Sequence, residues 1–130
     1  MNLKSIMKLI ITFSNCNMVA EILDTPTGRA IYSALPLKAK VSTWGEEIYF
    51  GIPVHSELEE GARAEVSVGD LAYWPNMPAF CIFFGPTPAS RGAEPQAASA
   101  VNVFGKVQDA DLEFLRGIHE GENVRVENAE

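Results

Sequence analysis

Apolar and polar residues alternate with a period of two along much of this chain, which predicts β-strands rather than helices. In residues 48–54 every second side chain is large and apolar, and Tyr49 and Gly51 lie between them. Residues 101–107 alternate in the same way, and Gly105 predicts a bulge in that strand. Other apolar stretches bounded by turn residues predict further strands. These are residues 8–13, 18–23, 66–68, 71–74, 79–84 and a last strand around Val124 and Val126.

Two short helices interrupt this pattern. The first is predicted to begin after Thr25, whose side chain can accept hydrogen bonds from free amides, and to end before Pro36. A second is predicted where an apolar stripe follows a capping Asp109. The members of that stripe are Leu112, Leu115 and Ile118. Many short strands with two helices predict a closed or nearly closed antiparallel β-barrel with helices over its ends.

Length and composition predict one domain over residues 1–130. Residues 1–6 are expected to be disordered or a non-native start, because Met7 leads directly into a strand. With 17 acidic and 10 basic residues, the net charge of -7 would repel a phosphate backbone, which argues against nucleic acid as a partner. No apolar run is long enough to span a membrane.

The cysteines and histidines predict neither a metal site nor a disulfide scaffold. Cys16 and Cys81 lie far apart in the sequence, and His55 and His119 have no ligand at metal spacing. We therefore expect a cytoplasmic protein without a cofactor.

Two motifs carry a resemblance to a known family. One is VGDLAYWP at residues 68–75, followed by AFCIFFGPTPAS at residues 79–90, and the other is WGEEIYFGIPV at residues 44–54. From about Met7 to its C-terminus the chain resembles the cyclophilin-like family of small prokaryotic proteins of unassigned function. The resemblance implies a mainly β fold, a closed antiparallel β-barrel of about eight strands with two short helices, in agreement with the elements above.

The resemblance also raises an isomerase hypothesis. True cyclophilins catalyse prolyl cis/trans isomerisation with an arginine beside a phenylalanine-rich pocket, but their Gln-Gly-Gly-Asp motif has no counterpart here. Arg91 is the only basic residue in the motif region. A peptidyl-prolyl isomerase is therefore the alternative to the leading hypothesis.

The leading hypothesis is a protein that binds a small or peptide-like ligand near the loop from Gly85 to Arg91. Prolines stiffen this loop, which could present hydroxyl groups and one cation beside aromatic walls. The candidate binding residues are Tyr73, Trp74, Phe83, Thr87, Ser90 and Arg91. The competing interpretation is that the Gly-Pro-Thr-Pro segment only spans one end of the barrel and that Trp74 belongs to the core.

A second candidate site lies at the turn before residues 48–54. Its candidate residues are Trp44, Glu46 and Tyr49. Glu46 could accept a hydrogen bond from a ligand, and Trp44 offers a stacking face. The competing interpretation is a solvated carboxylate in a hairpin turn. A third hypothesis is an interaction protein that forms homo-oligomers through an exposed sheet edge or through its acidic loop at residues 57–65.

Overall fold

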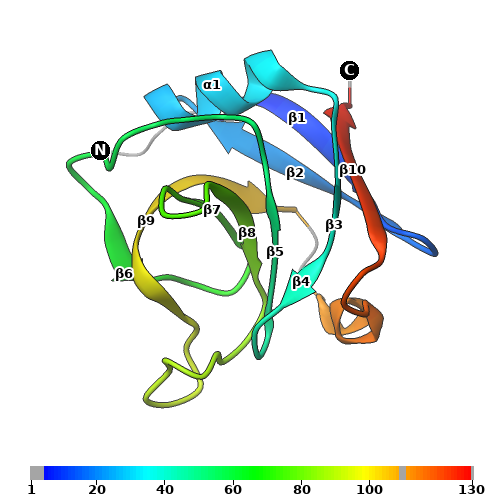
Figure 1. The fold of residues 1–130 in the computed structure, drawn as a ribbon, viewed down its shortest axis with the longest axis vertical. Coiled ribbons are helices and arrows are strands. Elements are labelled where there is room, and N and C mark those ends of the chain that lie inside the picture. The colour runs from blue at the N-terminus through cyan, green and yellow to red at the C-terminus, as the bar shows by residue number, and fades with distance from the viewer. Residues whose placement is uncertain (1–4, 109–110, 130) are drawn as a thin grey trace.

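The computed structural model describes residues 5–108 and 111–129, and these residues form a mainly β fold (Figure 1). The strands are β1 (Ser5–Thr12), β2 (Asn17–Leu23), β3 (Leu37–Lys40), β4 (Ser42–Thr43), β5 (Glu47–Gly51), β6 (Arg63–Glu65), β7 (Asp70–Trp74), β8 (Ala79–Phe83), β9 (Gln96–Val107) and β10 (Asn123–Asn128). The α-helix α1 (Pro26–Ala34) follows β2, and the 3-10 helix η1 (Glu113–Gly117) precedes β10. None of the described helices is long and apolar enough to cross a bilayer.

The strands pair in one antiparallel sheet whose order is β3-β10-β1-β2-β9-β7-β8-β5-β4, with β6 attached to β9. This order does not confirm the expected closed barrel of about eight strands. In the described residues nine strands form an open path, with β6 beside it, and the two end strands of the path are consecutive in the chain. Val41 joins them, and its own backbone bonds go to Glu122 and Gly121.

The first hairpin and the first helix agree with the predicted positions. Residues 7–12 of β1 pair with residues 17–22 of β2. β1 begins at Ser5, so the expected disorder does not extend to residues 5 and 6, and residues 1–4 lie outside the described part. Thr25 caps α1 by accepting a 2.9 Å hydrogen bond from the Gly28 amide. The helix ends at Ala34, because Pro36 keeps Leu35 in an extended conformation.

The second predicted helix is a single 3-10 turn instead of an α-helix. Its apolar residues recur every third position, which is the period of a 3-10 helix and not of an α-helix. Leu112, Leu115 and Ile118 are buried, and Ile118 is already extended. The predicted cap, Asp109, lies outside the described residues.

Several strand boundaries differ from the predicted ones. Residues 52–54 and 66–68 lie outside strands, whereas β6 and the first five residues of β9 occupy stretches that the alternation did not mark. The bulge predicted near Gly105 is present, because the pairing of β7 with β9 shifts between Leu71–Gly105 and Ala72–Val103.

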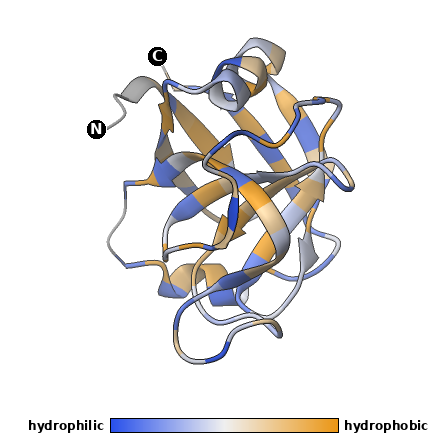
Figure 2. Ribbon diagram, turned by 90° about the vertical axis from the view of Figure 1, so that its left-hand side faces the viewer, coloured by the Kyte–Doolittle hydropathy of each residue, from blue (hydrophilic) through white to orange (hydrophobic). Residues whose placement is uncertain are grey.

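Hydrophobic side chains form two clusters on opposite faces of β5, β7 and β8. The larger cluster is the interior, where Phe80 stacks on Phe50 and meets Phe104 edge-on. The smaller cluster contains Ala72, Cys81 and other residues of the opposite face, which the start of β9 covers. Hydrophobic residues run along the strands, while many connecting loops are hydrophilic (Figure 2). β8 is buried on both faces, as its sequence suggests.

Candidate functional site

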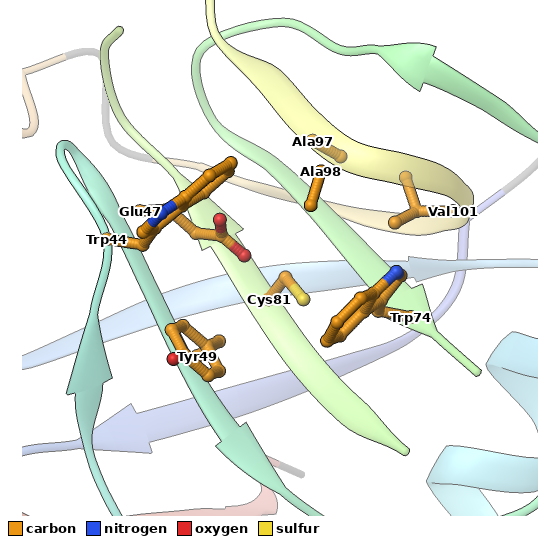
Figure 3. A pocket seen from close by; sticks show the side chains of 8 residues that line it. All are labelled: Trp44, Glu47, Tyr49, Trp74, Cys81, Ala97, Ala98 and Val101. Atoms are coloured by element: carbon orange, nitrogen blue, oxygen red, sulfur yellow. The ribbon is translucent and has the colours of Figure 1, made fainter. Parts of the chain in front are cut away.

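A pocket of about 260 Å³ opens beside the smaller cluster, between the strands β5, β8 and β7 and the first half of β9 (Figure 3). Its lining residues are Trp44, Glu47, Tyr49, Trp74, Cys81, Ala97, Ala98 and Val101. All but one of these side chains are aromatic, aliphatic or thiol groups. Glu47 is the one charged residue among them.

Strand alternation places the pocket side chains of β5, β7 and β8 on one face of the sheet. On β5, Ile48 and Phe50 point into the main core, so Glu47 and Tyr49 point to the other side. Tyr49 is directly opposite Cys81 in the ladder of β5 and β8. The face that carries the pocket is therefore a direct consequence of the alternation that builds the core.

Glu47 is a buried carboxyl group in an apolar environment. Its exposed fraction is 6%, and its side chain reaches towards Cys81 between the two tryptophans (Figure 3). Loss of hydration on burial raises the pKa of Glu47 to about 7, and a hydrogen bond with the Cys81 thiol partly opposes that rise. Among the described residues no lysine, arginine or histidine forms a salt bridge with it. The pocket thus holds an acid that changes charge near neutral pH.

Cys81 forms the floor of the pocket. It is fully buried, and burial followed by the charge of Glu47 raises the pKa of its thiol well above the usual value. A thiol that stays protonated is a poor nucleophile. Cys81 is therefore a hydrogen-bonding and packing group for Glu47.

The two tryptophans stand on opposite sides of the pocket (Figure 3). The Trp74 indole nitrogen donates a 2.7 Å hydrogen bond to the Ser99 hydroxyl, which ties the end of β7 to β9. Trp44 begins a tight turn in which its backbone exchanges hydrogen bonds of 3.0 and 3.2 Å with Glu47. Both walls are held by contacts outside the cavity.

Gly45 allows this turn to form. Its φ is +59°, and a Cβ at this position would lie 2.8 Å from the Cα of Thr87. The segment after Gly85 packs against the turn, and the Glu46 amide donates a 2.9 Å hydrogen bond to the Pro86 carbonyl. The proline-rich loop thereby supports the turn that carries Trp44 and Glu47.

The structure places the polar candidates of that loop outside the pocket. Thr87 is buried, and its hydroxyl bonds to the Gln96 carbonyl and the Ala89 amide. The Ser90 hydroxyl accepts a 2.9 Å bond from the Thr87 amide, so it closes the loop on itself. Arg91 is exposed and lines a separate depression formed by residues 91–96, 63 and 65–67.

Three further candidates also lie elsewhere. Tyr73 faces the main core, where its hydroxyl donates a 2.8 Å bond to the Val54 carbonyl and accepts one from Ser56. Phe83 is buried in the smaller cluster beside the pocket and does not line it. Glu46 pairs with Arg116 of η1 through a contact of 2.5 Å. Of the nine candidates, the structure brings Trp44, Tyr49 and Trp74 together in the pocket.

The neighbour of Glu46 is the residue that sequence reasoning missed. Residues 48–54 show the alternation, and extending it back by one position puts Glu47 on the face of Tyr49. The signal that this face is covered is the doubly apolar strand at residues 79–84. The pairing of β5 with β8 places Glu47 beside that strand, and this pairing cannot be derived from the local sequence pattern.

Within the described ranges, no three histidine, cysteine or acidic side chains cluster as a metal site would require. The two cysteines of the chain are free thiols.

Comparisons with known proteins show which proteins this chain is similar to. The hypothetical protein of Archaeoglobus fulgidus, known from a solution structure, is 41% identical to it, with 99% of this chain and all (100%) of that one covered and a TM-score of 0.81. McbB, solved in complex with tryptophan, shares the fold, with a TM-score of 0.65 at 12% identity over 93% of this chain and 44% of McbB. No curated protein matches the sequence. A profile described as cyclophilin-like matches residues 7–127, and the chain belongs to the cyclophilin-like family.

Proposed function

We propose that this protein binds a small or peptide-like ligand in the pocket between Trp44 and Trp74. The observation that carries the proposal is Glu47, a buried carboxyl group that faces a cavity of about 260 Å³ instead of a basic partner. Burying such a group is unfavourable, and it is typical of sites where a ligand supplies the missing contact. Apolar walls with few polar groups are the usual composition of ligand sites.

The isomerase hypothesis has less support. It requires a hydrogen-bond donor aimed at the substrate backbone, and Arg91 is its candidate. Arg91 belongs to a different depression, and the described residues that line the pocket include no basic side chain. Prolyl isomerase activity stays a prediction, to be tested with a proline peptide at high protein concentration.

Both tryptophans of the chain line the pocket, so indole signals report on it directly. We would record the two indole N–H resonances by NMR while adding neutral, anionic and cationic fragments in separate pools. Binding in the pocket should shift both resonances in a saturable way.

A blocking variant with a matched control decides where the fragments bind. Ala98 lies at the exposed rim with its side chain towards the pocket, so Ala98→Leu should occupy part of the cavity without unfolding the protein (Figure 3). Ala93→Leu makes the same change at an exposed alanine that does not line this pocket. We expect binding to survive in Ala93→Leu and to fall by about tenfold or more in Ala98→Leu. The proposal is wrong if no fragment shifts the indoles or if both variants bind alike.

A further inference from the structure

We infer that the ligand of this pocket carries an organic cation, an alkylammonium group held between Trp44 and Trp74 with its charge against Glu47. This inference rests on the proposed ligand-binding function and assigns the chemical class of the ligand. Three features of the pocket lead to it: its charge, its aromatic walls and its size.

The charge of the pocket is the first feature. Glu47 is its one charged lining residue, and the other polar groups nearby are a phenol, a thiol and indole N–H groups. An anionic ligand would bring a second negative charge into a dry cavity, which Coulomb repulsion opposes strongly. A cation would instead give the buried carboxylate the opposite charge that the described chain does not provide.

The aromatic walls are the second feature. Indole faces attract cations more strongly than the other aromatic rings do, and cages of aromatic side chains bind alkylammonium groups. Trp44 and Trp74 approach from opposite sides, while Tyr49 lies on the same side of the cavity as Trp44 and Glu47 (Figure 3). The side chains therefore surround a central position next to the Glu47 carboxylate.

The third feature is the size of the cavity. At about 260 Å³, it lies just below the usual range of about 300–1,000 Å³ for ligand pockets. A cavity of this size suits a compact head group or one end of a longer molecule. Its apolar walls fit methyl or methylene groups around a charged nitrogen better than a strongly hydrated inorganic ion.

The test compares a cation with a neutral molecule of the same shape. Choline and 3,3-dimethylbutan-1-ol differ in one atom, the quaternary nitrogen of choline being a carbon in the alcohol. At pH 8, where the Glu47 carboxyl is mostly ionised, each is titrated into the full chain while the two indole N–H resonances are followed. We expect choline to bind at least about tenfold more tightly than the alcohol.

Two variants assign that preference to Glu47. Glu47→Gln keeps the shape of the side chain and removes its charge, so it should abolish the preference for choline. Glu60→Gln makes the same change at an exposed glutamate outside the pocket and should keep it. The amide spectrum of each variant establishes that it is folded.

The outcomes separate the inference from the proposed function. Two results would overturn the inference that the ligand is a cation held by Glu47: equal or tighter binding of the neutral alcohol, or a preference for choline that survives in Glu47→Gln. Either result would leave the proposed ligand binding intact. If neither molecule shifts the indole N–H resonances, the inference of a cationic ligand is overturned as well. The fragment pools and Ala98→Leu then decide by themselves whether the pocket binds ligands.

Discussion

The Glu47 carboxyl group links the chemistry of the pocket to the stability of the fold. Its pKa is about 7 in the folded protein and 4.5 as the ordinary value, so the folded state holds a proton that the unfolded state releases. Between these values the folded protein binds more protons than the unfolded chain, and stability contributed by this group falls as pH rises. The pocket is thus maintained at a cost in stability at neutral and alkaline pH.

Glu47→Gln should remove this pH dependence. The shift corresponds to a loss of about 3 kcal/mol in the free energy of unfolding between pH 4.5 and pH 7.5, at the upper limit. We expect wild type to lose stability relative to Glu47→Gln over that interval and to be the less stable of the two at pH 8. Urea denaturation of both proteins at several pH values measures the difference. Parallel pH profiles would show that Glu47 does not titrate as described.

Burial and local pattern make some site residues predictable from sequence and leave others hidden. Trp44 and Trp74 stand out because large aromatic residues beside turns are common in binding sites. Thr87 and Ser90 have suitable hydroxyl groups, but the structure uses both inside their own loop. Local sequence does not show which hydroxyl groups are already satisfied.

At the scale of elements, the buried side chain of Asn102 holds the acidic loop at residues 57–65 on the sheet. Asn102 on β9 donates hydrogen bonds to the Thr27 hydroxyl (3.0 Å) and to the Glu57 carbonyl (2.8 Å). Its side-chain oxygen accepts a 2.8 Å bond from the Glu59 amide. The Glu59 carboxylate in turn accepts hydrogen bonds from the backbone and hydroxyl of Thr27 at the start of α1. The acidic loop is therefore fastened to both β9 and α1.

Asn102→Ala should release this loop. The substitution leaves the Glu57 carbonyl and the Glu59 amide without their partner, which we expect to cost about 3 kcal/mol of unfolding free energy. Hydrogen exchange at residues 55–62 should accelerate as well. Asn76→Ala, at an exposed turn residue, is the control and should change stability by less than about 0.5 kcal/mol. A loss no larger than that of the control would contradict the fastening role.

The elements that the sequence predicts best are those fixed by local chemistry. Helix α1 has its cap at Thr25 and its stop at Pro36, and the structure confirms both. The strands β6 and the start of β9 were not predicted, because their pairing with each other joins residues far apart in the chain. The turn at η1 was predicted as an α-helix because its three-residue spacing resembles an apolar helical stripe over so short a stretch.

At the scale of the whole molecule, the sheet leaves short edges. The end strand β4 has two residues and β6 has three, while β3 places Lys38 and Lys40 at exposed positions. Short strands and exposed lysines disfavour edge-to-edge pairing. We expect sedimentation velocity to find a monomer at high protein concentration. A stable dimer would favour the homo-oligomer hypothesis instead.

The overall architecture illustrates what local patterns leave open. Period-two alternation predicts a mainly β chain, but not that β3 and β4 end an open path while Val41 connects them. The same pattern does not reveal that β9 is long enough to pair with β7 and β2 and also to cover the outer face. The pocket exists because β9 also covers the outer face of the sheet.

The most direct test of the account is the affinity of choline measured against pH with the two indole resonances. The charge of choline does not depend on pH, and Glu47 is the one charged residue that lines the pocket. The account predicts constant affinity above pH 7 and a loss of up to about tenfold for each pH unit below it. Affinity that stays unchanged from pH 5 to pH 8 would contradict a ligand held by the ionised Glu47.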